Sequence, residues 1–194
     1  MASSLHLLSA LPLPESVDSD AALLDRARVD RAAFAPIYRR YAPDIYRYCY
    51  RCLGCREDAE DATSQVFTQA LSKLAQLQDD NIRPWIYRIA HNVVIDMSRK
   101  ARPTASLDDA DAASSNDPSP ESEALASEQR ERLMRALATL SGRDRQLVQL
   151  RLSGLTGEEI AVVLDCSHGA IRVAHHRAME RLRVILSDQE AHHA

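Results

Sequence analysis

Cys49, Cys52 and Cys55 form a C-x2-C-x2-C pattern, a residue type and spacing found in metal and iron–sulfur sites. A fourth cysteine, Cys166, is remote in the sequence and would complete a set of four thiolates in number only. Cys49 and Cys52 fall on an expected helix rich in aromatic residues, where free cysteine often serves as core. We therefore predict no metal and no cofactor, and a cysteine-based redox or metal sensor remains an alternative.

The acids Asp58, Glu60 and Asp61 are the other group that could do chemistry, as general acids or bases. They lie at an expected helix start, where the helix dipole favours carboxylates, and no base or nucleophile accompanies them. The chain also lacks G-x-x-x-x-G-K-[ST], G-x-S-x-G and H-E-x-x-H. The sequence thus predicts no catalytic residues and a protein that is not an enzyme.

The composition favours helices throughout. Of 194 residues, 45% are hydrophobic and only five are glycine, while alanine, leucine, arginine and glutamate are abundant. This predicts an all-α fold of two small domains. No apolar run approaches the roughly 20 residues that cross a bilayer, so we expect no membrane insertion and a cytoplasmic protein. The N-terminal segment lacks the basic start of a signal peptide and is expected to be a flexible extension.

The expected first domain contains helices at 21–28, 32–52, 57–77 and 85–100. In the second helix, Phe34, Ile37 and Tyr41 begin one apolar stripe at helical spacing, although Pro43 interrupts its pattern. Residues 79–83 are expected to form a polar loop, with Pro84 opening the following helix. On that helix Arg88, Asn92, Asp96 and Arg99 share one face, which suits base and phosphate contacts but also suits a solvated amphipathic surface. Trp85 is expected to pack in the core.

An acidic segment follows the first domain. Between residues 103 and 131 there are eight carboxylates and a single arginine, and Pro118 and Pro120 break the chain. Such a segment buries too little apolar area to offset its ordering entropy, so we expect a flexible linker. Basic segments at 85–102 and 168–185 flank it, with four basic residues and one acid in each. Local positive charge can attract phosphates despite the net charge of −4.

The expected second domain ends in a helix-turn-helix pattern, LTGEEIAVVLDCSHGAIRVAHHRAMERLR. A helix carrying Leu133, Leu137 and Leu140 and a helix at 143–152 capped by Ser141 precede it. Thr156 is expected to cap a short helix at 157–164 in a capping box with Glu159. Asp165 tolerates the left-handed turn that follows, and Ser167 caps the last helix, at 168–186. A helical hairpin with a solvated basic face would fit the same pattern.

The order of these segments resembles the sigma-70 family in its small two-domain form, the extracytoplasmic-function sigma factors. The matching stretches are FAPIYRRYAPDIYRYCY, DAEDATSQVFTQAL, IRPWIYRIAHNVVIDMSRK, the acidic linker and LATLSGRDRQLVQLRLSGLTGEEIAVVLDCSHGAIRVAHHRAMERLR. The boundaries are an extension at 1–19, sigma domain 2 at 20–102, a linker at 103–124, sigma domain 4 at 125–187 and a tail at 188–194. The implied function is a polymerase subunit that recognises promoters and opens their strands.

The resemblance implies partners and site residues. The partners are the RNA polymerase core (the clamp of its largest subunit and the flap of its second largest), promoter DNA and an anti-sigma factor. The core contacts are Asp58, Glu60, Asp61, Gln65 and Val66. The contacts to the −10 element, where a flipped base is captured, are Asp80, Asn81, Ile82, Arg83, Arg88, Asn92, Asp96, Arg99 and Lys100. The contacts to the −35 element are Ser167, His168, Gly169, Arg172, Val173, His175, His176 and Arg177.

The chain departs from the family pattern in its recognition helix. Ala170, Val173 and Ala174 stand where the family usually has threonine, serine or a basic residue, so no promoter sequence is carried over. Ile82 stands where the base-capture loop often has phenylalanine. A stand-alone helix-turn-helix regulator that binds DNA without polymerase is the second alternative, which the expected first domain argues against.

Overall fold

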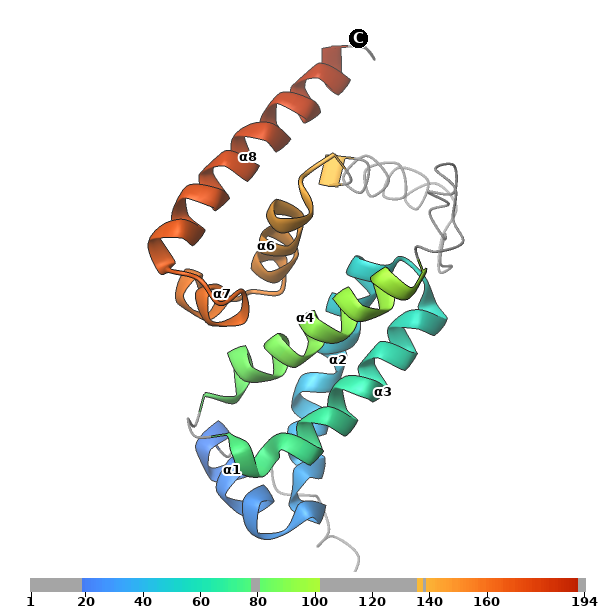
Figure 1. Ribbon diagram of the computed structural model, residues 1–194, viewed down its shortest axis with the longest axis vertical. Coiled ribbons are helices and arrows are strands. Elements are labelled where there is room, and N and C mark those ends of the chain that lie inside the picture. Colours follow the sequence, from blue (N-terminus) through green and yellow to red (C-terminus); the bar gives the residue numbers. More distant parts are fainter. Residues whose placement is uncertain (1–18, 78–80, 102–135, 138, 192–194) are drawn as a thin grey trace, which may run out of the picture.

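The structure is a computed structural model that describes residues 19–77, 81–101, 136–137 and 139–191, with side-chain surroundings as far as Ile185. Within these ranges every regular element is a helix, so the predicted all-α fold is confirmed (Figure 1). The expected linker and most of the N-terminal extension lie outside the described residues, as does Leu133. No helix in the described ranges is both long and apolar enough to cross a membrane.

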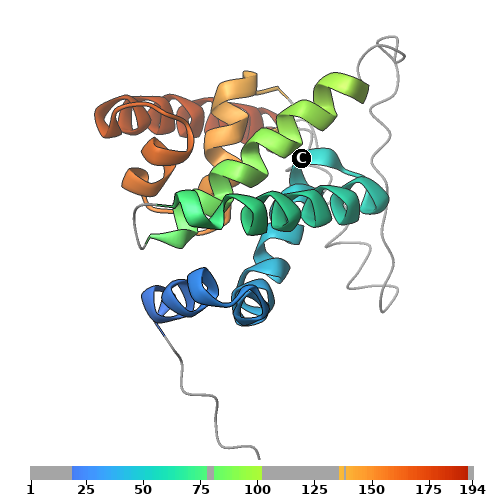
Figure 2. The same cartoon turned by 60° about the horizontal axis from the view of Figure 1, so that its bottom comes forward.

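The α-helices of the first domain lie within a few residues of their predicted ranges, and two short 3-10 turns follow α1 and α3. The elements are α1 (Asp20–Val29), η1 (Arg31–Phe34), α2 (Ala35–Leu53), α3 (Arg56–Lys73), η2 (Leu74–Gln76) and α4 (Ile82–Ala101). Helices α2, α3 and α4 pack side by side, and α1 packs against the N-terminal part of α2 (Figures 1 and 2). The Asp20 carboxylate accepts a 2.5 Å hydrogen bond from the Tyr41 hydroxyl and also binds Arg40, which ties α1 to α2.

The apolar stripe of α2 forms the centre of this domain. Ile37, Ile45 and Tyr48 are fully buried against α3 and α4. Pro43 does not break α2, which continues through it as one helix. Pro43 has no N–H to donate to the carbonyl of Arg39, one turn earlier in the helix. Both residues are exposed, so the lost hydrogen bond lies on the water-facing side of α2 and not in the core. Gly54, with φ +77°, then ends α2 in the left-handed conformation that favours glycine.

The predicted loop at 79–83 is wrong for its last two residues, Ile82 and Arg83, because α4 begins at Ile82. Pro84 therefore stands in the first turn of α4, where its missing N–H costs no helical hydrogen bond. Ile82 is only 1% exposed. Burial of its side chain in the core favours starting the helix earlier than the proline signal predicts.

The second domain contains α6 (Gly142–Leu152), α7 (Gly157–Val163) and α8 (His168–Ala191). The Ser141 hydroxyl accepts a hydrogen bond from the Asp144 N–H at 3.2 Å, which confirms the predicted cap of α6. The buried apolar side chains of this domain include Leu137, Leu140, Leu147, Val148, Leu150, Ile171 and Ala178. The last helix runs past its predicted end at Leu186 to Ala191.

The two domains are in contact with each other. Helix α7 packs on the N-terminal part of α4, and α6 packs on α2 (Figures 1 and 2). The loop between α6 and α7 lies at the centre of this contact, where Leu155 is 1% exposed. The helix-turn-helix therefore lies beside the helix that carries the other predicted DNA surface.

Candidate nucleic-acid interface

The helix-turn-helix has the local geometry that its sequence predicts. The Thr156 hydroxyl accepts from the Glu159 N–H at 3.2 Å, and the Glu159 carboxylate accepts from the Thr156 N–H at 2.7 Å. Both hydrogen bonds of the capping box are thus present at the start of α7. Asp165 has a φ of +50°, as expected for the turn, and the Ser167 hydroxyl caps α8 by accepting from the Ala170 N–H at 3.2 Å. These contacts fix the position and direction in which α8 begins after α7.

The N-terminal half of α8 turns an extended surface outward. Ser167, His168, Gly169, Arg172, Val173, His176 and Arg177 are exposed, and His175 is half-buried. The opposite face is anchored by Ile171 and Ala178. All eight residues predicted to contact the −35 element thus lie on or beside one accessible face. Val173 is 56% exposed, an apolar side chain among cationic ones.

Four arginines supply positive charge along α8, and they differ in their surroundings. Arg181 forms an ion pair with Asp144 at 3.1 Å, and Arg183 pairs with Glu180 at 2.9 Å. Arg172 and Arg177 make no ion pair or side-chain hydrogen bond with any residue that the structure describes. Their guanidinium groups can meet phosphates without first leaving a protein partner.

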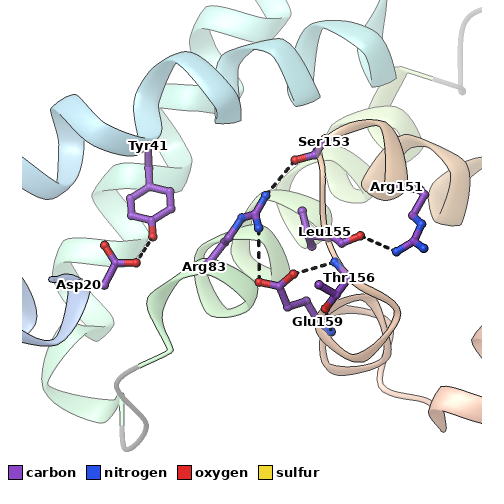
Figure 3. Close-up of polar contacts among 8 residues, drawn as sticks. All are labelled: Asp20, Tyr41, Arg83, Arg151, Ser153, Leu155, Thr156 and Glu159. Carbon is purple, nitrogen blue, oxygen red and sulfur yellow. Dashed lines mark hydrogen bonds and ion pairs between the residues drawn. The ribbon is translucent and has the colours of Figure 1, made fainter.

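A shallow hollow next to α8 brings in a residue that the sequence patterns missed. Its lining includes Arg151, Gly157, His168, Arg172 and His175. Arg151 comes from the end of α6, and its Nη1 donates to the Leu155 carbonyl at 2.9 Å (Figure 3). No sequence signal marks it, because it reaches this surface only through packing of α6 against α8. A Cβ at Gly157 would lie 2.7 Å from Nε2 of His168, so a larger residue there would displace the exposed His168 imidazole.

A second polar surface runs along α4. Arg88, Asn92, Asp96, Arg99 and Lys100 are exposed, and the first four share the helix face that their spacing predicts. Asn81 is exposed ahead of the helix, and Arg83 is half-buried in its first turn. Asp80 lies outside the described residues. Ile82 is a correction: it was expected in the base-capture loop, but its side chain is core and does not face an incoming base.

The candidate core-docking residues lie at the start of α3. Asp58, Glu60, Asp61 and Gln65 are exposed, and the Glu60 carboxylate accepts from Nε of Arg56 at 2.9 Å. Val66 is a second correction, because its side chain is completely buried in the first domain. Val66 lies on the apolar stripe of α3, and its side chain therefore packs in the core. The exposed acids remain a surface that a basic partner can meet.

The four cysteines differ in their surroundings. Cys49 is buried in the first domain, Cys52 and Cys55 are half-buried, and Cys166 lies in the turn before α8. Burial raises the pKa of Cys49 to about 12 and that of Cys52 to about 11. A raised pKa keeps these thiols protonated near neutral pH, the opposite of the shift that activates a reactive cysteine. Among the described residues, no cluster of three or more His, Cys, Asp or Glu side chains is arranged to hold a metal ion.

Comparison with known proteins gives two family matches and several similar relatives. Residues 37–104 match Sigma-70 region 2, and residues 130–182 match Sigma-70, region 4. The chain is 32% identical over 183 residues to the ECF RNA polymerase sigma factor BldN of Streptomyces coelicolor, covering 89% of this chain and 69% of that protein. It is 30% identical over 172 residues to the ECF RNA polymerase sigma factor SigW of Bacillus subtilis, covering 82% and 91%.

Two solved structures share the fold. One is CnrH in complex with the cytosolic domain of CnrY, with a TM-score of 0.68 and 22% identity over 88% of this chain and 99% of that one. The other is the sigma factor RpoE in complex with the anti-sigma factor NepR from Bartonella quintana, with a TM-score of 0.63 and 20% identity over 79% and 96%. The family matches and the identity to curated relatives agree with the motifs that the sequence carries. The chain therefore belongs to the sigma-70 family and, within it, to the extracytoplasmic-function RNA polymerase sigma factors.

Proposed function

We propose that this protein is a dissociable subunit that directs bacterial RNA polymerase to a specific set of promoters and performs no chemistry of its own. The observation that carries the proposal is the pair of exposed polar faces, on α4 and on the N-terminal half of α8, each in a separate sigma region. Two surfaces on one chain suit the two elements of a bacterial promoter. The protein then acts where RNA polymerase acts, in the cytoplasm.

In this proposal residues 20–102 bind core polymerase and the −10 element, and residues 125–187 bind the −35 element. Residues 103–124 link them, with 1–19 and 188–194 as flanking segments. Arg88, Asn92 and Arg99 follow the −10 strand along α4. Arg172 and Arg177 meet phosphates beside the −35 element, together with Arg151 from the hollow next to α8. Val173 offers an apolar contact of the kind that a thymine methyl group accepts.

The exposed acids of α3 are proposed to dock on the clamp of the largest polymerase subunit. The relatives RpoE of Bartonella quintana and CnrH were solved with NepR and CnrY. These pairings support a similar regulator for this chain, an anti-sigma factor that covers the surfaces described above. Promoter opening would then be controlled by release of the protein rather than by its synthesis alone.

Run-off transcription with purified core polymerase and the DNA upstream of the protein's own gene tests this function. A discrete transcript that requires the protein is the expected result. If no transcript appears and no complex with core polymerase elutes from a sizing column, the stand-alone regulator becomes the better explanation. Asp61→Asn tests the docking surface: we expect weaker core binding, whereas Glu57→Gln, an exposed acid of the same helix start, should bind core normally.

A further inference from the structure

The hollow next to α8 brings together two arginines and two histidines. Arg151 comes from α6, while His168, Arg172 and His175 come from α8, where their spacing of four and three residues places them on one face. The rest of the lining is apolar or glycine: Leu147, Gly157, Ile160 and Ile171. Every ionisable side chain that lines the hollow is therefore positive or becomes positive when it takes up a proton.

The two arginines keep hydrogen-bond donors free for a ligand. Nη1 of Arg151 donates to the Leu155 carbonyl at 2.9 Å, which holds the guanidinium group at the end of α6 (Figure 3). A guanidinium group has five N–H donors, so Arg151 retains others. Arg172 is exposed and makes no ion pair or side-chain hydrogen bond with any described residue.

The two imidazoles are placed at the hollow by packing. The imidazole of His168 takes up the space that a side chain at position 157 would need, because a Cβ on Gly157 would lie 2.7 Å from its Nε2 and 3.0 Å from its Cδ2. His175 is half-buried one turn beyond Arg172. Both rings thus lie beside the two guanidinium groups, and neither extends freely into solvent.

The carboxylates of the neighbouring elements lie outside this hollow. They are Asp144 on α6, Glu158 and Glu159 on α7, and Asp165 in the turn before α8. Asp144 pairs with Arg181 at 3.1 Å, and Glu159 lies 3.6 Å from Arg83. Asp165 lines a separate hollow with Arg88, and Glu158 is exposed. The other cations of α6, Arg143 and Arg145, do not line the hollow either.

This lining selects an oxygen-rich anion. The hollow measures about 120 Å³, and a water molecule takes up about 30 Å³ of the liquid, so a phosphate group fits. Two guanidinium groups repel a metal cation, and among the described residues no three His, Cys, Asp or Glu side chains are arranged to hold one. Arginine and protonated histidine donate charge-assisted hydrogen bonds to phosphate oxygens.

We propose that the hollow binds one backbone phosphate of the −35 DNA together with protons on His168 and His175, so that this contact strengthens as the pH falls. The inference rests on the proposed function, which places α8 on the −35 element. Histidine is the side chain whose charge ordinarily changes between pH 5 and 8. Arginine and a phosphodiester keep their charges over that range, so the two imidazoles are the groups in the hollow that respond to pH.

The coupling between proton and phosphate follows from charge. A bound phosphate favours the protonated form of a neighbouring imidazole. By linkage, the protonated imidazoles bind the phosphate more tightly by the same factor. Each histidine is therefore expected to change the affinity for DNA about three- to tenfold between pH 8 and 6.

Proton uptake is measured one histidine at a time by NMR. The imidazole resonances of the full chain are titrated between about pH 5 and 8, with and without a short DNA duplex at constant ionic strength. Duplex DNA is expected to move the titration midpoints of His168 and His175 to higher pH. His176 is exposed beside His175 but does not line the hollow, so its midpoint should move less. If neither His168 nor His175 responds to the duplex, the proposal is wrong.

The effect on affinity is measured by fluorescence anisotropy with the same duplex at about pH 8 and pH 6. His168→Asn and His175→Asn should each lose about a three- to tenfold share of the pH dependence, and the double variant should lose most of it. His176→Asn is the matched control, and its pH dependence should equal that of the wild type. Thermal unfolding at both pH values checks that each variant is folded. A double variant with the wild-type pH dependence would overturn the proposal.

Sodium sulfate distinguishes a DNA phosphate from a free oxyanion, because its charge is constant over this pH range. It replaces chloride at constant ionic strength in the NMR titration. If sulfate moves the midpoints of both histidines and duplex DNA does not, the hollow binds a free anion and its assignment to DNA is wrong. These measurements need neither polymerase nor a promoter sequence. A missing transcript would therefore refute the proposed function, whereas the histidine data alone decide the phosphate site.

Discussion

The free arginines of α8 allow a quantitative test of the −35 surface. Arg172 and Arg177 are exposed and make no ion pair among the described residues, so each can neutralise one phosphate. Each such contact contributes about 0.9 to the slope of log K against log salt concentration. Arg172→Ala or Arg177→Ala should therefore lower the magnitude of this slope by about 0.9, and the double variant by about 1.8.

These slopes translate into a measurable change of affinity. Between 50 and 200 mM salt, a slope difference of about 0.9 changes the ratio of wild-type to variant affinity by about 3.5-fold. The double variant should show a change of about 12-fold over the same range. Holoenzyme binding to a fluorescent promoter duplex, titrated at several KCl concentrations, gives both slopes directly.

Arg183→Ala provides the control for this experiment. Arg183 lies on the same helix but is paired with Glu180 at 2.9 Å, so a phosphate contact there requires that pair to break. We expect its slope to differ from the wild type by much less than 0.9. Slopes that are unchanged in Arg172→Ala and Arg177→Ala would refute the assignment and move the phosphate contacts to another face of the second domain.

Three further predictions concern stability and reactivity. Thr156→Ala removes half of the capping box and should destabilise the second domain by about 1 kcal/mol, measured by thermal unfolding; no loss would show that Glu159 alone caps α7. Iodoacetamide at pH 8 should label Cys55 well before Cys49, because a pKa of about 12 leaves almost no thiolate at Cys49. Mass spectrometry of samples digested at successive times measures both rates, and equal rates would contradict the prediction. Burial lowers the pKa of His91 in the folded protein. The stability that neutral His91 contributes is therefore present above its unfolded-state pKa of about 6.5 and is lost as the pH falls below that value. Between pH 7 and 5, the melting temperature of His91→Gln should fall less than that of the wild type.

Local signals in the sequence predict the second domain well. Ser141, Thr156 with Glu159, Asp165 and Ser167 each act within a few residues, and every one makes the predicted cap or turn. The exposure of the recognition face follows equally from helical periodicity. Properties that depend on neighbours three or four residues away can be read from a single chain.

Positions where burial competes with a motif are less predictable. Ile82 and Val66 match motif positions of the family, but both side chains complete the core of the first domain. Pro84 suggests a later start for α4, and the burial of Ile82 overrides that signal. The contact of Arg51 with Gln149 joins residues 98 positions apart, and neither residue carries a pattern that marks it in advance.

The Tyr87 hydroxyl is buried near Ser153 of the second domain, and it has no hydrogen-bond partner of standard geometry among the described residues. A polar group held away from water without a partner costs about 1–3 kcal/mol, which hydration returns when the domains separate. Tyr87→Phe removes this hydroxyl and is therefore expected to raise the melting temperature of the protein.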